Sequence, residues 1–212
     1  MPKDFTQSSR AKVTRMTAGQ RKAQIIEVTL RLVDEYGVQG TTTPRIAAAA
    51  GVSEPILYKH FKSRREMLLA ALDVVFDQAE DVVRSSQEPN VLERLRQIGE
   101  YHTNATYAKR LGFVSPLFEF VIAPAEVGLR ERVRSRSLVI AQALASMIEE
   151  GIAQGTIRPD IDPQLVAWQV IGFYWLEDVS FLMDVDEVVT LGASADLLER
   201  ILAGIAAEAA PI

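Results

Sequence analysis

Cysteine is absent from the 212-residue sequence, and histidine occurs only twice, at His60 and His102. A chain without thiols forms neither disulfides nor thiolate metal sites. Two histidines provide few groups for acid–base catalysis, and the sequence lacks a Gly-x-Ser-x-Gly motif, a phosphate-binding loop and a His-Glu metal motif. We therefore expect a protein that is not an enzyme and that requires neither a metal ion nor another cofactor.

Long apolar runs are also missing. The longest nearly apolar segment covers residues 165–176, is interrupted by Gln169, and is shorter than the roughly 20 residues that a membrane-spanning helix needs. Residues 1–15 lack the apolar core of a signal peptide. These absences predict a soluble, cytoplasmic protein without a membrane partner.

Positive charge is scarce over the whole chain but concentrated at its beginning. The formal net charge is -5, yet residues 1–70 hold 12 Lys and Arg against 6 Asp and Glu, and the remainder carries -11. A basic region in an acidic protein predicts a local anionic partner, either nucleic acid or a membrane surface. A solvated basic tail is the alternative that charge alone leaves open.

Helical periodicity runs through nearly every segment, without strand-like alternation, internal repeats or low-complexity tracts. The sequence therefore predicts an all-α chain of about nine helices. We expect them near residues 17–36, 43–50, 53–60, 63–84, 91–109, 113–122, 129–153, 163–183 and 194–207.

The most informative segment reads TTPRIAAAAGVSEPILYKHFKSRR and covers residues 42–65. Ala47 and Ala50 allow two short helices to approach closely, and Gly51 gives the turn between them its backbone freedom. The second helix is then free to enter the major groove of DNA, which is wide enough for one helix. The pattern is that of a helix-turn-helix.

This segment resembles the N-terminal module of the TetR family of bacterial regulators. The residues that match the family pattern are Thr41, Thr42, Ile46, Ala47, Ala50, Gly51, Val52, Ser53, Leu57, Tyr58, His60, Phe61 and Ser63. Two positions depart from it: Arg64 replaces a common lysine, and Arg45 replaces a common acidic residue. The resemblance implies nine or ten helices, dimerisation through the last two long helices, a palindromic operator, and release of that operator when a small ligand enters the C-terminal domain.

On this basis we divide the chain into four parts. They are a flexible basic arm (1–16), a three-helix helix-turn-helix DNA-binding domain (17–65), a linking helix (66–84) and a C-terminal helical bundle for ligand sensing and dimerisation (85–212). We predict a ligand-responsive repressor that binds double-stranded operator DNA as a homodimer and is released by an unknown, largely apolar small molecule. The alternative is a helical protein-interaction or small-molecule-binding module, whose DNA affinity would not fall steeply with added salt.

The residues expected to contact DNA form two groups. Donors such as Tyr58 and Lys62 suit phosphate oxygens, whereas Glu54 and Lys59 stand where base edges can be read. The full set is Thr42, Thr43, Arg45, Ser53, Glu54, Pro55, Ile56, Tyr58, Lys59, His60, Lys62 and Arg64. The alternative for Glu54 is that it only complements the helix dipole, and for Tyr58 that it only packs.

Candidates for the ligand pocket come from the apolar helical faces. They are His102, Thr106, Phe113, Phe118, Trp168 and Trp175. A lone histidine on an apolar stripe is more often a core residue than a ligand contact, so His102 has both interpretations. Trp168 and Trp175 flank Gly172, where a notch can admit a partner helix or an apolar ligand; dimer packing is the favoured use.

The last two helices supply the expected dimer interface. Its candidates are Phe173, Tyr174, Phe181, Leu198, Ile201, Leu202 and Ile205. Two charged clusters are interpreted as solvated surface. They are the arginines Arg130, Arg132, Arg134 and Arg136, and the acidic residues Glu177, Asp178, Asp184, Asp186 and Glu187, which lack the spacing of a calcium loop.

Overall fold

The computed structural model describes residues 16–107, 114–185 and 191–207. Within these ranges the chain is all-α, as predicted, and its one β-type contact is the isolated bridge between Ile157 and Ala206. Apart from Met16, the expected basic arm lies outside the described residues, as do the pocket candidate Phe113 and the acidic residues Asp186 and Glu187. Across the described part of the chain, no helix combines the length and apolar character needed to cross a bilayer.

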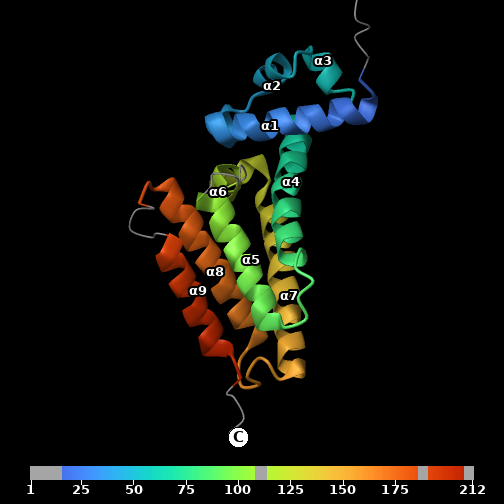
Figure 1. Cartoon of the computed structure of the whole chain (residues 1–212). Helices are drawn as coiled ribbons and strands as arrows, with labels where there is room; N and C mark the ends of the chain where they lie inside the picture. The colour runs from blue at the N-terminus through green and yellow to red at the C-terminus, as the bar shows by residue number, and fades with distance from the viewer. Residues whose placement is uncertain (1–15, 108–113, 186–190, 208–212) are drawn as a thin grey trace, which may run out of the picture.

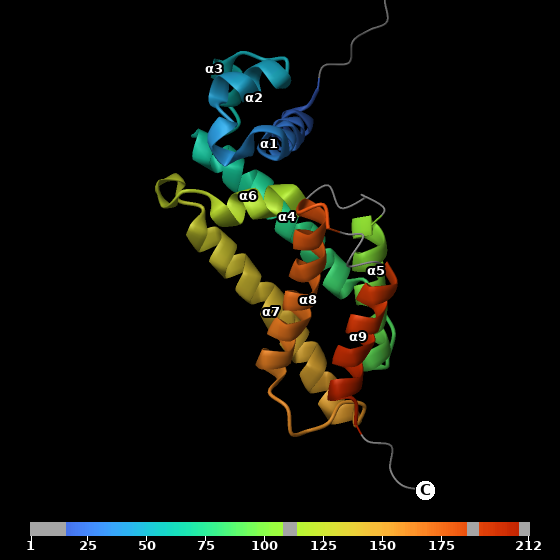
Figure 2. The same ribbon diagram turned by 90° about the vertical axis from the view of Figure 1, so that its left-hand side faces the viewer.

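The described helices are close to those expected from the sequence. They are α1 (Ala18–Gly40), α2 (Thr43–Ala49), α3 (Glu54–Leu57), α4 (Arg64–Arg84), α5 (Val91–Tyr107), α6 (Val114–Ile122), the 3-10 helix η1 (Ala125–Val127), α7 (Arg130–Gln154), α8 (Pro163–Leu182) and α9 (Leu191–Ile205). Figure 1 shows α1 lying across one end of α4, with α2 and α3 on the side of α1 that faces away from the bundle. In Figure 2 the longer helices α5, α7, α8 and α9 run side by side below them.

Helix α1 has strong signals at both ends. The Thr17 hydroxyl oxygen accepts a hydrogen bond from the Gln20 amide, and the Gln20 side-chain oxygen accepts one from the Thr17 amide, which makes a capping box. Near the other end Gly37 has φ +67° and breaks the helix, after which one further turn runs to Gly40. The helix end predicted at Tyr36 therefore corresponds to this break. The backbone of Gly37 has a conformation there that favours glycine.

The helix-turn-helix forms through its small and apolar residues. Gly51 takes φ +64° at the turn, and Ile46, Leu57 and Phe61 are buried against α1 and α4. Helix α3 ends at Leu57, earlier than predicted, but the amides of His60 and Phe61 still donate to the Leu57 carbonyl at 2.9 and 3.0 Å. Residues 58–61 thus continue the direction of α3 as tight turns.

Helix α4 joins the helix-turn-helix to the bundle. Ser63 caps its start by accepting from the Glu66 amide at 3.2 Å. The Glu66 carboxylate, however, accepts from the Lys62 amide instead of completing a capping box with Ser63. Further along, α4 buries Leu68, Leu72 and Val75, so the linking helix belongs to the core of both parts.

The arginines at the start of α7 are not simply solvated, which corrects the interpretation from the sequence. Arg136 contacts Asp77 at 2.6 Å and Glu80 at 2.7 Å, and Arg132 contacts Asp73 at 3.5 Å. Arginines four residues apart on α7 thus face acids that recur along α4. We call these five residues the α4–α7 ion-pair ladder.

The bundle core explains the apolar stripes of the last two helices. Phe173, Leu198, Leu202 and Ile205, all expected at a dimer interface, are buried within the chain in the cluster that also holds Leu95. They are buried because α9 packs directly on α5, where a Cβ at Gly99 would lie 2.4 Å from a methyl group of Leu198. The structure therefore places these four residues in the protomer core, while Ile201 and Phe181 remain partly exposed.

Candidate functional site

The helix-turn-helix presents most of the expected DNA contacts on its surface. The exposed members of that set are Thr42, Arg45, Ser53, Glu54, Pro55, Tyr58, Lys59 and Lys62. Ile56, His60 and Arg64 are partly exposed, and Thr43 is buried. Because α2 and α3 form the end of the molecule that faces away from the bundle (Figure 1), this surface is open to a large partner.

Tyr58 and Lys59 directly follow α3. Tyr58 exposes 49% of its surface to solvent, and Lys59 is exposed as well. Half-exposed tyrosine and lysine side chains suit phosphate oxygens and base-edge acceptors, respectively. Glu54 lies in the first turn of α3, and the side chain of the preceding Ser53 makes no capping hydrogen bond to that turn.

Arg64 and Arg45, the two departures from the family pattern, hold the end of α1 in place. Arg64 donates to the Thr41 carbonyl at 2.6 Å and to the Val38 carbonyl, and burial lowers the pKa of its guanidinium. Arg45 donates to the Gly40 carbonyl, and its guanidinium lies 4.0 Å from the centre of the Tyr36 ring. These two arginines, both expected to face DNA, therefore use part of their donor capacity within the protein.

Two hydrogen-bonded contacts link the helix-turn-helix domain to the bundle, in addition to apolar packing. The Val38 amide donates to a Glu119 carboxylate oxygen at 3.3 Å, and Arg65 donates to the Gly128 carbonyl at 2.7 and 3.2 Å. Glu119 belongs to α6, and Gly128 lies between η1 and α7. A movement of α6 would therefore change the hydrogen bond to the Val38 amide, next to the Gly37 break of α1.

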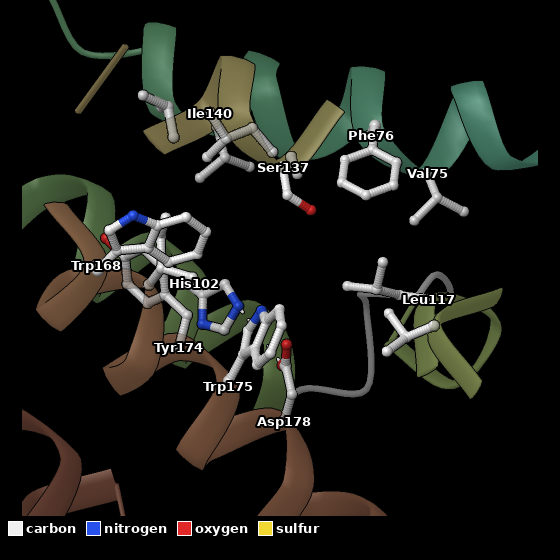
Figure 3. Close-up of a pocket in the computed structure, with 15 residues that line it drawn as sticks. Val75, Phe76, His102, Leu117, Ser137, Ile140, Trp168, Tyr174, Trp175 and Asp178 are labelled. Carbon is white, nitrogen blue, oxygen red and sulfur yellow. Dashed lines mark ion pairs between the residues drawn. The ribbon is translucent and has the colours of Figure 1, made fainter. Parts of the chain in front are cut away.

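Within the bundle lies a mostly apolar cavity of about 90 Å³. It is lined by Val75, Phe76, Ala79, Val82, Val83, His102, Leu117, Val121, Ser137, Ile140, Trp168, Ile171, Tyr174, Trp175 and Asp178. Figure 3 shows the α4 side chains Val75 and Phe76 across the space from Tyr174, Trp175 and Asp178 of α8. The cavity is thus bounded partly by the same helix that begins at the helix-turn-helix.

One end of the cavity is polar and charged. His102 Nδ1 lies 3.0 Å from Glu177, His102 Nε2 lies 3.5 Å from Asp178, and Thr103 donates to Glu177 at 2.7 Å. Burial of the imidazole opposes its protonation, but the nearby carboxylates of Asp178 and Glu177 outweigh burial and raise the pKa of His102 to about 9. The imidazole is therefore a cation at neutral pH.

Polar atoms remain without partners at this end. Among the described residues, no hydrogen bond satisfies the Tyr174 hydroxyl or Asp178 Oδ1, two buried atoms of the cavity lining. The predicted pocket residue Thr106 is buried and its Oγ1 is also unsatisfied, but it does not line the cavity. Burial raises the pKa of Tyr174 above its ordinary value, so the phenol keeps its proton. Buried polar atoms are normally satisfied, and exceptions often mark a place for water or a ligand.

The two tryptophans lie at the rim of the cavity. Trp168 and Trp175 both line it, yet 42% and 41% of their surfaces are exposed. Phe118 meets the edge of the Trp175 ring with the ring centres 6.2 Å apart. Of the predicted pocket residues, the structure thus brings His102, Trp168 and Trp175 to one cavity and leaves Phe118 beside it.

The chain is similar to known proteins in both sequence and fold. Residues 25–71 match the family model described as bacterial regulatory proteins, tetR family. The HTH-type transcriptional repressor KstR2 of Mycobacterium tuberculosis is 29% identical over 168 residues, which cover 70% of this chain and 76% of KstR2. The crystal structure of AibR in complex with isovaleryl coenzyme A and operator DNA superposes with a TM-score of 0.59 at 27% identity, over 74% of this chain and 85% of AibR. This chain belongs to the TetR family.

As a TetR-family protein it is a ligand-responsive transcriptional regulator, and an interaction module without DNA binding is not favoured. The fold extends across the family, since a TetR regulator from Haloarcula marismortui has a TM-score of 0.74 at only 18% identity, covering 89% of this chain and 99% of that one. Regulators of this family are in general DNA-binding proteins without enzymatic activity.

The charged end of the cavity was not predicted from the sequence. Glu177 and Asp178 were interpreted as solvating a helix end, but each is only 2% exposed and both face His102. Tyr174 was expected at the dimer interface, but it lines the cavity and stacks on His102 with ring centres 4.5 Å apart. The available signal was the placement of two adjacent acids within an otherwise apolar helix, because such acids need a buried partner.

Proposed function

We propose that this regulator is a cytoplasmic repressor that binds a palindromic operator as a homodimer and is released when a small, largely apolar molecule occupies the cavity. It binds that molecule without converting it. The observation that carries the proposal is that α4 starts at the exposed helix-turn-helix surface and lines the cavity with Val75 and Phe76. One rigid helix therefore belongs to both sites, and a change of its position at one site is transmitted to the other.

In the proposed DNA complex, α3 and the turn after it lie in the major groove. Lys59 then reads base acceptors, while Tyr58 and Lys62 bind phosphates. The exposure of all three side chains supports these roles. A dimer would place two such surfaces in successive major grooves about 34 Å apart.

For the dimer, α8 and α9 offer an apolar face that the described part of the chain leaves uncovered. Leu165, Leu176 and Leu197 are 70%, 46% and 37% exposed. Gly172 lies on the same helix as the first two, and a Cβ there would meet nothing within 4 Å. These exposed residues, together with Ile201, replace the buried side chains first expected at the interface.

DNA binding is tested by selecting bound sequences from a random duplex pool, followed by titration of the selected site. We expect a palindromic consensus whose affinity falls steeply with added salt. Tyr58→Ala should weaken binding to all sequences alike, whereas Lys59→Ala should relax preference at one base pair per half-site. Arg134→Ala, which removes an exposed arginine of α7, is the matched control and should leave the titration unchanged. A pool without enrichment at any salt concentration would refute the proposal.

The dimer is tested separately by light scattering. Leu176→Glu places a charge on the exposed face of α8 and should shift the protein toward a monomer. Tyr101→Glu alters a side chain of α5 that is equally open to solvent and serves as the control. A wild-type protein that is monomeric at micromolar concentration would contradict the proposed interface.

A further inference from the structure

The cavity has one polar end whose acceptors are not matched by donors. Asp178 is 2% exposed, lines the cavity, and leaves its Oδ1 atom without a hydrogen bond within the described residues. His102 Nε2 lies 3.5 Å from that atom, and this ion-pair contact leaves Oδ1 without a hydrogen bond. A buried carboxylate oxygen that faces an apolar space is expensive unless a donor occupies that space.

The charges around this end do not cancel. The His102 imidazolium stands against two carboxylates, of which Glu177 is satisfied by His102 at 3.0 Å and by Thr103 at 2.7 Å. None of the residues that the structure describes around the cavity is a lysine or an arginine. Within the part of the chain that the structure describes, one negative charge, that of Asp178, is therefore left over next to the apolar space.

The same geometry disfavours a ligand that ends in a carboxylate. Both ring nitrogens of His102 already face carboxylates, so the imidazolium has no free direction from which to bind another anion. An incoming carboxylate would instead meet Asp178 at short range, where like charges repel strongly because the surroundings are apolar. A donor or a cation meets neither obstacle.

Taking the proposed function as the basis, we infer that the effector is a small aliphatic amine, bound in its protonated form with the ammonium group on Asp178 and the chain among the apolar side chains. The Tyr174 hydroxyl, which also lacks a partner, lies at the same end and can accept a second ammonium hydrogen. A volume of about 90 Å³ is smaller than the roughly 150 Å³ of an engineered cavity that holds benzene, so a short, thin chain fits better than a ring system.

The protein carries its own reporter for this site. The chain contains two tryptophans, and both line the cavity. Hexylamine, 1-hexanol and hexanoate share one apolar chain and differ only in the end group. Titration of each compound at pH 7.4, followed by tryptophan fluorescence, compares cation, neutral donor and anion at the same position.

We expect hexylamine to bind about tenfold more tightly than hexanoate, with 1-hexanol between them, since a charge-assisted hydrogen bond contributes roughly that factor. Asp178→Asn should abolish the preference for the amine and leave 1-hexanol nearly unaffected. Asp184→Asn makes the same substitution at an exposed site and is the matched control. The ranking of the three compounds on wild-type protein tests the inference even if the Asp178 variant does not fold.

Failure of the inference differs from failure of the proposed function. Two results would refute the amine as effector but leave the proposed effector cavity intact. In the first, hexanoate binds as tightly as hexylamine; in the second, isovaleryl coenzyme A changes the fluorescence and hexylamine does not. An amine affinity that Asp178→Asn leaves unchanged would overturn the inference too. If none of the four compounds alters the tryptophan signal or releases the selected operator, the proposed effector cavity fails together with the inference.

Discussion

His102 should titrate far above the range of an exposed histidine. Its ring nitrogens face Glu177 and Asp178 at 3.0 and 3.5 Å, and these carboxylates raise its pKa from 6.5 to about 9 in spite of burial. In an NMR titration of the imidazole protons, one of the two histidine signals should have its midpoint near pH 9. His102→Gln should remove that signal and leave the signal of His60.

This titration has a consequence for stability. Because the pKa of His102 is higher in the folded protein than in the unfolded chain, the folded state binds the proton more tightly. The resulting stabilisation is fully present below pH 6.5 and is lost as the pH rises through 9. At about 1.4 kcal/mol per pKa unit, the difference between 6.5 and about 9 corresponds to roughly 3 kcal/mol of unfolding free energy.

Urea denaturation between pH 7 and 9.5 measures that loss. The free energy of unfolding of wild-type protein should fall toward pH 9.5 by more than that of His102→Gln, and His60 is common to both proteins, so its contribution cancels. Equal pH dependence of the two proteins, together with a His102 midpoint near 6.5, would show that the buried ion pairs do not form in solution.

Four further substitutions test the helix-turn-helix domain and the packing of the bundle. Gly37→Ala should destabilise the protein by about 2 kcal/mol in thermal denaturation, because φ +67° strains any other residue and the new Cβ would displace Glu119. Gly99→Ala should cost about 1–3 kcal/mol, since its Cβ would lie 2.4 Å from Leu198; Gly19→Ala, with nothing within 4 Å, is the control for both and should not lower the melting temperature. Lys62→Ala should weaken DNA binding uniformly and reduce the salt slope by about one, whereas Arg64→Ala should mainly lower the melting temperature, because it leaves the Val38 and Thr41 carbonyls without a donor. The reverse pattern would assign Arg64 to the DNA contact.

Local signals allowed the helix-turn-helix to be predicted closely. Pro44 and Pro55 stand in first turns, Gly51 at the turn and Ser63 at a helix start, and each of these residues acts over only a few positions. The end of α3 was placed too late because residues 58–61 keep helix-like hydrogen bonds without forming a regular helix. Signals of this kind need no knowledge of the rest of the fold.

Long-range pairing could not be predicted in the same way. His102 and Glu177 are 75 positions apart, and helical periodicity does not reveal which helices face each other. Helix α8 is apolar on most of its circumference, so its two acids mark no polar face. Likewise, the stripe of Leu198 and Leu202 indicates burial but does not distinguish burial in the same chain from burial against a second copy.

The α4–α7 ion-pair ladder makes the linking helix itself sensitive to ionic strength. Its contacts between Arg136 and Asp77 and between Arg132 and Asp73 involve partly exposed side chains, whose attraction is screened by added salt. Salt in a DNA-binding experiment therefore acts at two places, on the phosphate contacts and on the seating of α4 against α7. The salt slope of operator binding therefore has to be measured with Asp77→Asn as well, because this variant weakens the ion pairs between α4 and α7. The comparison of the two slopes separates the phosphate contacts from the effect of salt on α4.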